Sequence, residues 1–198
     1  ALAGVFFLML MMFGMGYGFG VQAHMSRKNG EKAWAEIGRS FRSGVLFLTG
    51  LAAVLIVLSD LAAKPFLDTA CESAAVAEAA DTYLYWRVWG LPFVFACALL
   101  RAFFIATLRP GVLTASSLVI VASNFVLNYV LIFGAGPVPA MGIAGAAIAS
   151  TISEAVCLVF LLGYVLLRVD HGKYALFGSF SWDGALQRSL FRLGRWLM

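Results

Sequence analysis

The stretch VLTASSLVIVASNFVLNYVLIF (residues 112–133) contains no charged residue and is long enough to cross a membrane as a helix. It nevertheless carries two primary amides, Asn124 and Asn128, at a spacing that places both on one face of a helix. An amide costs several kcal/mol to bury in hydrocarbon unless it finds a partner. We therefore expect the two asparagines either to join two helices or to line a wet cavity.

The composition of the whole chain is that of an integral membrane protein. Its 198 residues are 62% hydrophobic and only 12% charged, and the mean hydropathy is +0.92. A soluble domain is about half apolar and about a quarter charged. Five apolar segments of membrane-spanning length cover residues 2–21, 44–61, 83–104, 112–133 and 143–167. Strands of a membrane barrel would be about half as long and would alternate. The predicted fold class is all-α integral membrane, with five transmembrane helices.

The connections between these segments differ in charge, which predicts their orientation. Basic residues gather in the connections 24–42 and 105–111 and in the tail 168–198, whereas the other two connections are acidic or uncharged. By the positive-inside rule the three basic regions are cytoplasmic. Residue 1 would then lie outside, so we expect one further helix upstream and a unit of six helices. The tail 168–198 is predicted to be a cytoplasmic linker toward a seventh helix.

One acidic residue, Glu154, stands near the middle of the last apolar segment. An ionisable group at this depth is expensive, and its default interpretation is functional, here as a proton or cation coupling group. The alternative is a protonated glutamate that hydrogen-bonds a neighbouring helix. Gly142, Ala146 and Ser150 precede Glu154 at four-residue intervals. Small residues at this spacing allow close helix packing, so Ser150 and Glu154 are expected on a packed face rather than toward lipid.

The third apolar segment contains two further residues of note. Arg87 lies near its outer end, where a long side chain can extend to the membrane surface, so we expect a structural role for it. Pro92 lies inside the segment and is expected to bend the helix, because it removes a backbone hydrogen bond.

The sequence contains none of the patterns of soluble enzymes. It has no phosphate-binding loop, no metal-ligand cluster and no nucleophile–base pair. Cys71, Cys97 and Cys157 are scattered and are interpreted as small apolar residues. We therefore expect no enzymatic activity, no cofactor, no bound metal and no nucleic-acid partner. The expected surroundings are membrane lipid.

Several motifs resemble those of one transporter family, in order along the chain. They are GFGVQAHMSRKNGEKAWAEIGRSFRSG (18–44), YWRVWGLPF (85–93), RAFFIATLRPGVLTASSLVIVASNFVLNYVLIFG (101–134) and PAMGIAGAAIAST (139–151). They are similar to helices two to six of the multidrug and toxic compound extrusion (MATE) family, in its NorM-like branch. The resemblance implies a twelve-helix fold of two six-helix lobes, in which residues 1–167 form helices two to six of the N-terminal lobe. The first helix and the C-terminal lobe would be further parts of the same chain.

The resemblance also implies a function. Members of the family export small cationic or amphipathic compounds in exchange for protons or sodium, with alternating access between the lobes. This implies a multi-pass protein of the bacterial inner (plasma) membrane, with a proton or sodium ion as coupling ion.

The same resemblance suggests candidate site residues. One branch of the family forms a cation site from an acid on the first helix, an Asn and an Asp on the fifth, and a Thr on the sixth. The last three positions correspond to Asn124, Asn128 and Ser150 in this chain. Asn128 replaces the Asp and Ser150 the Thr, whereas NorM-type members carry important acids in the C-terminal lobe. Asn124, Asn128, Ser150 and Glu154 are thus predicted to face a cation or substrate cavity.

Two other functions remain open at this stage. A lipid-linked sugar flippase of the same superfamily would carry several basic residues in its cavity, and the spans here hold almost none. A non-transporting membrane scaffold would use Glu154 and the asparagines only to hold helices together.

Overall fold

A computed structural model describes residues 2–70, 73–135, 137–176, 178 and 183–197, so Cys71 lies outside the described residues. Apart from an isolated bridge between Ala135 and Val138, the regular structure in these ranges is helical. The helices are α1 (Leu2–Gly30), α2 (Trp34–Ala70), α3 (Ala74–Val88), α4 (Leu91–Ala106), α5 (Pro110–Phe133), α6 (Gly142–Arg168), α7 (His171–Tyr174) and α8 (Gly184–Leu197).

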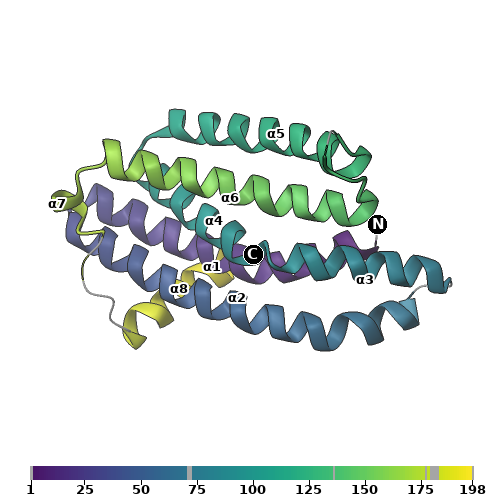
Figure 1. Cartoon of the computed structure of the whole chain (residues 1–198). Coiled ribbons are helices and arrows are strands. Elements are labelled where there is room, and N and C mark those ends of the chain that lie inside the picture. The colour runs from purple at the N-terminus through teal and green to yellow at the C-terminus, as the bar shows by residue number, and fades with distance from the viewer. Residues whose placement is uncertain (1, 71–72, 136, 177, 179–182, 198) are drawn as a thin grey trace.

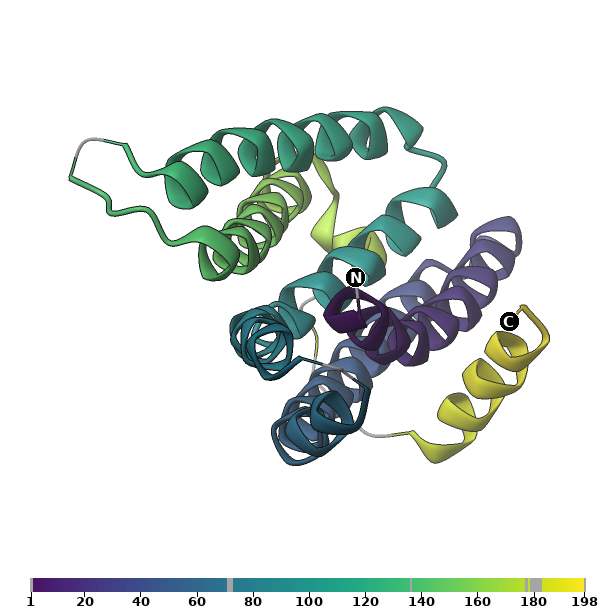
Figure 2. The ribbon, with the colours of Figure 1, turned by 90° about the vertical axis from the view of Figure 1, so that its right-hand side faces the viewer.

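The helices are arranged around α4. An antiparallel pair, α5 and α6, lies on one side, and α1 and α2 lie on the other (Figure 1). The view along the bundle shows α4 between these pairs, with α8 beside α1 (Figure 2). The aromatic rings of Phe95, Phe103 and Phe104 on α4 are almost completely buried. α4 therefore carries much of the apolar core that joins the two pairs.

The five predicted spans are present, but one of them is broken. α1, α2, α5 and α6 are each long and apolar enough to cross a membrane. The third predicted span, residues 83–104, falls on α3 and α4, which meet at an angle of 49° and together are long and apolar enough for one broken span. The bend expected from Pro92 thus takes the form of a break, and Pro92 lies in the first turn of α4. Proline is tolerated there because the first helical amides have no partner within the helix.

Several helices extend beyond the apolar segments that predicted them. α2 runs without interruption from Trp34 to Ala70, although its apolar segment covers only residues 44–61. Similarly, α3 begins at Ala74, ahead of the apolar segment that starts at residue 83. Hydropathy marks the part of a helix that lies in hydrocarbon, whereas backbone hydrogen bonding continues into the polar boundary.

The expectation that Arg87 extends to the membrane surface is wrong. Its side chain lies in the bundle, and the residue is only 8% exposed. It forms a bidentate ion pair with Glu154 of α6. Nη1 donates to Oε2 at 3.0 Å and Nη2 donates to Oε1 at 2.5 Å. Because α3 begins at Ala74, Arg87 lies about three and a half turns into the helix rather than near its outer end.

The break between α3 and α4 provides the space for this ion pair. A Cβ atom on Gly90 would lie 2.4 Å from Nη1 of Arg87 and 2.7 Å from Oε2 of Glu154. Gly90 has φ −74°, which any residue adopts, so glycine is required for space and not for backbone conformation. The centre of the Phe7 ring lies 3.9 Å from the guanidinium carbon of Arg87.

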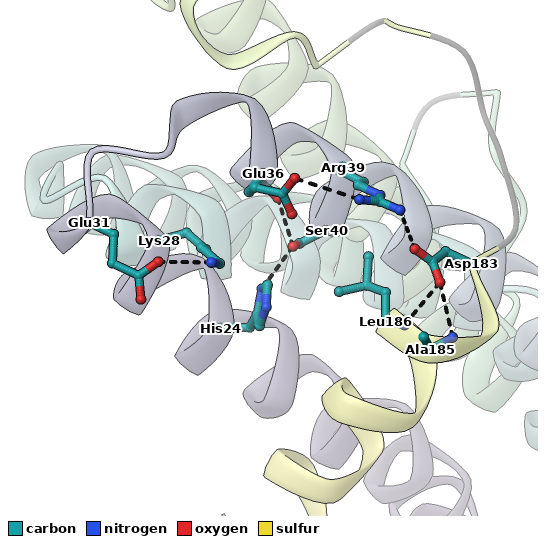
Figure 3. Close-up of polar contacts among 9 residues, drawn as sticks. All are labelled: His24, Lys28, Glu31, Glu36, Arg39, Ser40, Asp183, Ala185 and Leu186. Atoms are coloured by element: carbon teal, nitrogen blue, oxygen red, sulfur yellow. Dashed lines mark hydrogen bonds and ion pairs between the residues drawn. The ribbon is translucent and has the colours of Figure 1, made fainter.

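The C-terminal helix α8 is attached to α1 and α2 by specific polar contacts. Asp183 precedes its first turn and accepts hydrogen bonds from the backbone amides of Ala185 at 3.0 Å and Leu186 at 3.1 Å. The same carboxylate forms an ion pair with Arg39 of α2 (Figure 3). The buried Gln187 amide donates to Ser43 Oγ at 2.9 Å. α8 therefore has a defined register on α2.

The contact of α8 with α1 is made at backbone distance. A Cβ atom on Gly20 would lie 2.2 Å from the carbonyl oxygen of Leu190, and one on Gly194 would lie 2.6 Å from that of Gly16. Tyr17 of α1 also donates to Gln187 Oε1 at 2.6 Å. Small residues at this crossing allow α8 to pack directly on α1.

We predict that Gly90→Ala destabilises the protein by about 1–3 kcal/mol, because the added methyl group overpacks the site and pushes the ion pair apart. The melting temperature of the purified protein in detergent measures this effect. Gly50→Ala on α2 is the matched control, because no atom lies within 4 Å of the position of its added Cβ. Equal melting temperatures for Gly90→Ala and Gly50→Ala would contradict the assigned role of Gly90.

We predict that the attachment of α8 weakens in acid. The hydrogen bond from Leu186, together with that from Ala185 and the Arg39 charge, lowers the pKa of Asp183. A carboxylate whose pKa is lower in the folded state stabilises that state at neutral pH. Its contribution is lost as the pH falls below the unfolded pKa of about 3.9 and through the folded value.

Hydrogen exchange of the α8 amides, followed by mass spectrometry, measures this attachment. Acid should increase α8 exchange in the wild type and much less in Asp183→Asn, which keeps an amide acceptor at the start of the helix but removes the titrating charge. The same acid response in both proteins would show that Asp183 is not responsible.

Candidate functional site

A pocket of about 530 Å³ opens between α3, α5 and α6. All four residues predicted for the cavity border it: Asn124, Asn128, Ser150 and Glu154. Arg87, the ion-pair partner of Glu154, borders it as well. Its lining residues are Arg87, Ile120, Val121, Asn124, Phe125, Asn128, Tyr129, Phe133, Ser150, Ser153 and Glu154.

The two asparagines and Ser150 form one hydrogen-bonded chain along a wall of the pocket. Asn128 Nδ2 donates to Asn124 Oδ1 at 2.7 Å, and Asn124 Nδ2 donates to Ser150 Oγ at 3.3 Å. Ser150 in turn donates to the carbonyl oxygen of Ala146 at 3.1 Å. Within the described residues nothing donates a hydrogen bond to Asn128 Oδ1, so this oxygen is available to a ligand. Both asparagines thus border the cavity, and Asn124 also joins α5 to α6.

Glycines in and around the α5–α6 turn bring this chain together. Gly134 ends α5 with φ +79° and Gly142 begins α6 with φ +53°, conformations that are costly for residues with a side chain. A Cβ atom on Gly145 would lie 2.4 Å from the carbonyl oxygen of Leu131, so the two helices touch at their backbones. This close approach lets the short side chain of Ser150 reach Asn124.

The row of small residues on α6 that packs closely lies beside the expected row, in which Gly142 is exposed and Ala146 and Ser150 are half-buried. Gly145, Ala149 and Ser153 are all buried. Ser153 donates to the carbonyl oxygen of Ala149 at 2.6 Å, which satisfies its hydroxyl within α6. A polar side chain on this row therefore does not disturb the packing.

Arg87 and Glu154 form the charged part of the pocket lining, and they are separate from the asparagine chain. In the residues that the structure describes, no hydrogen bond links Glu154 to Ser150 or Asn128, although all three border the same space. The carboxylate oxygens of Glu154 are instead used by the Arg87 guanidinium. The pair as a whole is neutral, which reduces the cost of holding both charges at this depth.

The sequence interpretation missed Arg87 as a pocket residue. The signal for it was the presence of two arginines, Arg87 and Arg101, in one apolar segment and of Glu154 in another. Charged side chains within membrane spans pair with one another, so one of these arginines was an expected partner for Glu154. The positions 87 and 154 are 67 residues apart, and spacing along the chain does not bring them together.

The outer wall of the pocket is aromatic and open. Phe125 is 77% exposed and Tyr129 is 64% exposed, and both lie on α5 next to the asparagines. Only 6% of the apolar window of α5 is buried, compared with 33% for α1. α5 therefore presents a large apolar surface that the described residues do not cover.

The described residues contain no cluster of three or more His, Cys, Asp or Glu side chains that could hold a metal ion. The side-chain oxygen atoms of the lining residues are the amide oxygens of Asn124 and Asn128, the hydroxyls of Tyr129, Ser150 and Ser153, and the Glu154 carboxylate. Amide, hydroxyl and carboxylate oxygens are ligands for hard cations or partners for polar substrate groups, and they offer no redox chemistry.

Comparison with known proteins agrees with this architecture. The sequence profile of the MatE family matches residues 1–131. A probable multidrug resistance protein NorM from Mesorhizobium japonicum is 31% identical over 199 residues, covering 98% of this chain and 42% of the relative. A probable multidrug resistance protein NorM from Rhodopseudomonas palustris is 31% identical over 192 residues, covering 95% of this chain and 40% of the relative. The chain thus spans about two fifths of the length of these curated relatives.

Solved structures show the same fold. An inward-facing multidrug resistance MATE family transporter of the MOP superfamily superposes with a TM-score of 0.85 at 16% identity, covering 96% of this chain and 42% of that one. An outward-facing MATE family transporter gives a TM-score of 0.77 at 18% identity, covering 97% and 42%. The fold, the family profile and the relatives agree that this chain belongs to the MatE family of multi-pass membrane transporters and forms part of an N-terminal lobe.

Proposed function

We propose that the protein to which this chain belongs exports small cationic or amphipathic compounds, and that a gradient of protons or sodium drives the export. The observation that carries the proposal is the pocket between α3, α5 and α6. It combines an open aromatic wall with amide groups and an acid paired to a base, and mostly apolar pockets with a few polar groups are typical ligand sites.

The lining of the pocket offers different contacts to different parts of such a compound. The exposed rings of Phe125 and Tyr129 supply apolar contact and can hold a cation over a ring face. Asn128 Oδ1 is available to accept a hydrogen bond, while the other asparagine contacts keep the wall in place. Broad apolar contact with few polar anchors suits a transporter that accepts several substrates.

Coupling to an ion is proposed at the same pocket. The oxygens of Asn128 and Ser150 suit a sodium ion, whereas Glu154 is the group that can take up and release a proton. Either event would change the local charge beside Arg87. Alternating access by movement of one lobe against the other would then expose the pocket to each side of the membrane in turn.

The two alternative functions find less support in the pocket. A flippase for lipid-linked sugars needs basic groups for a phosphate, and the only base in the described lining is Arg87, which is already paired. A purely structural role explains the Asn124–Ser150 bond but leaves the Asn128 oxygen and the open aromatic wall without a purpose.

The proposed location is the inner (plasma) membrane of a bacterium, with residues 24–42, 105–111 and 168–198 on the cytoplasmic side. The apolar helices support a location in a membrane, and the bacterial relatives support the assignment to a bacterial membrane. The basic residues in these three regions support the orientation.

We predict that cells expressing the full-length parent protein extrude ethidium, and that an uncoupler or removal of the sodium gradient abolishes the extrusion. Asn124→Ala should slow the efflux by about fivefold, because the loss of a hydrogen bond worth about 1 kcal/mol disorders the pocket wall. Glu154→Gln should reduce the dependence of efflux on the ion gradient if the acid couples transport.

Ethidium fluorescence in loaded cells measures the efflux rate. Asn29→Ala at the end of α1 is the matched control, because Asn29 lies outside the pocket lining. Gradient-independent efflux, or equal loss of efflux in Asn29→Ala and Asn124→Ala at equal expression, would contradict the proposal.

A further inference from the structure

A second pocket, of about 610 Å³, lies where the C-terminal helix α8 crosses α1. The α1 side of this pocket is uncharged and includes the rings of Phe13 and Tyr17. The α8 side carries Arg188, Phe191 and Arg192. No lining residue is shared with the pocket between α3, α5 and α6. The crossing of α8 and α1 therefore combines aromatic surface with two positive charges at a separate place in the fold.

The two arginines of this pocket are not neutralised by the described part of the chain. Arg188 and Arg192 are both exposed, and neither forms an ion pair with a described residue. They lie four positions apart in α8, so they share one face of the helix. The nearest acid along the chain, Asp183, is already paired with Arg39. An anion at this pocket would thus meet two cations without displacing an existing partner.

The packing of α8 on α1 sets the depth of the pocket. The two helices run antiparallel and lie side by side (Figure 2), with Leu190 against Gly20 and Gly194 against Gly16 at backbone distance. The apolar segment predicted to cross the membrane in α1 ends at residue 21. The crossing therefore begins at the membrane boundary and continues for one turn, about 5 Å, into the bilayer. The boundary between lipid headgroups and acyl chains lies at this depth.

An exposed apolar stripe on α1 leads from the pocket toward the middle of the membrane. Val5, Met9 and Phe13 follow one another at four-residue intervals, so they share one face of α1. All three are exposed in the described structure. Phe13 also borders the pocket, so the stripe begins beside the two arginines. From residue 13 to residue 5 the stripe is about 12 Å long and follows the direction of an acyl chain.

We propose that the crossing of α8 and α1 binds one anionic phospholipid. Arg188 and Arg192 bind the lipid phosphate, and an acyl chain lies along Phe13, Met9 and Val5. Guanidinium groups bind phosphate through paired, charge-assisted hydrogen bonds. Long arginine side chains also reach the headgroup level from a helix that dips below it. The lipid thereby becomes part of the attachment of α8 to α1.

A lipid fits this site better than a soluble anion does. A free phosphate would use the arginines alone, and ion pairs between exposed groups contribute little in water. A lipid adds the burial of apolar surface along α1 and is concentrated in the bilayer around the protein. In α8, Leu186 and Leu190 face α1 and α2 while Arg188 and Arg192 are exposed. Basic amphipathic helices of this kind bind anionic membrane surfaces.

Native mass spectrometry of the full-length parent protein, released from detergent, measures the lipid that stays bound. The probes are phosphatidylglycerol and phosphatidylcholine with identical acyl chains, added in equal amounts. We predict that the wild type binds phosphatidylglycerol about tenfold more tightly and that Arg188→Gln/Arg192→Gln loses most of this preference. Arg188→Lys/Arg192→Lys should keep much of it, because both positive charges remain. Phe13→Ala should weaken the binding of both lipids alike, because it removes acyl-chain contact and leaves the arginines in place.

Arg27→Gln/Arg168→Gln is the matched control, because it removes the same number of charges and neither residue lines the pocket. An unchanged preference in Arg188→Gln/Arg192→Gln, or an equal loss in the matched control, would overturn the inference. Displacement of phosphatidylglycerol by an equal concentration of glycerol 3-phosphate would indicate a site for soluble anions and would overturn it as well. The readout is lipid binding, so each result holds whether or not the protein exports ethidium.

Discussion

A chain in hydrocarbon has no water to satisfy its polar groups, and this constraint governs the whole structure. The backbone meets it by forming helices. The side chains meet it by bonding to one another: Arg87 pairs with Glu154, and Asn124 bonds to both Asn128 and Ser150. Among the described side chains, the one buried nitrogen or oxygen without a hydrogen bond is Nε of Arg101. The Arg87–Glu154 and Asn124–Ser150 bonds therefore join different helices, and all four residues border one pocket.

Much of the fold and part of the site follow from local patterns in the sequence. Five spans could be predicted because apolar segments of the required length are rare outside membranes. The proximity of Asn124 to Ser150 could be anticipated because α5 and α6 are connected by a short turn and thus pack as neighbours. The bend near Pro92 follows from the missing amide of proline.

The remaining features depend on contacts between distant segments, which local patterns do not encode. The pairing of Arg87 with Glu154 requires α3 to pack on α6, and nothing in the flanking residues indicates it. The true depth of Arg87 was hidden because hydropathy places the start of the span at residue 83, well after α3 begins. The attachment of α8 similarly depends on Gln187 meeting Ser43 from the opposite end of the chain.

The break between α3 and α4 has an electrostatic consequence for the ion pair. Arg87 lies in the last turn of α3, where the free carbonyl groups give the helix end a partial negative charge. Gly90, the residue before α4, lies against Glu154 Oε2, where the free amides of the next helix give a partial positive charge. Each member of the pair thus sits beside the helix end of opposite sign. An unbroken helix through this position would present neither helix end. The break between α3 and α4 therefore places a partial negative charge beside Arg87 and a partial positive charge beside Glu154 within the membrane.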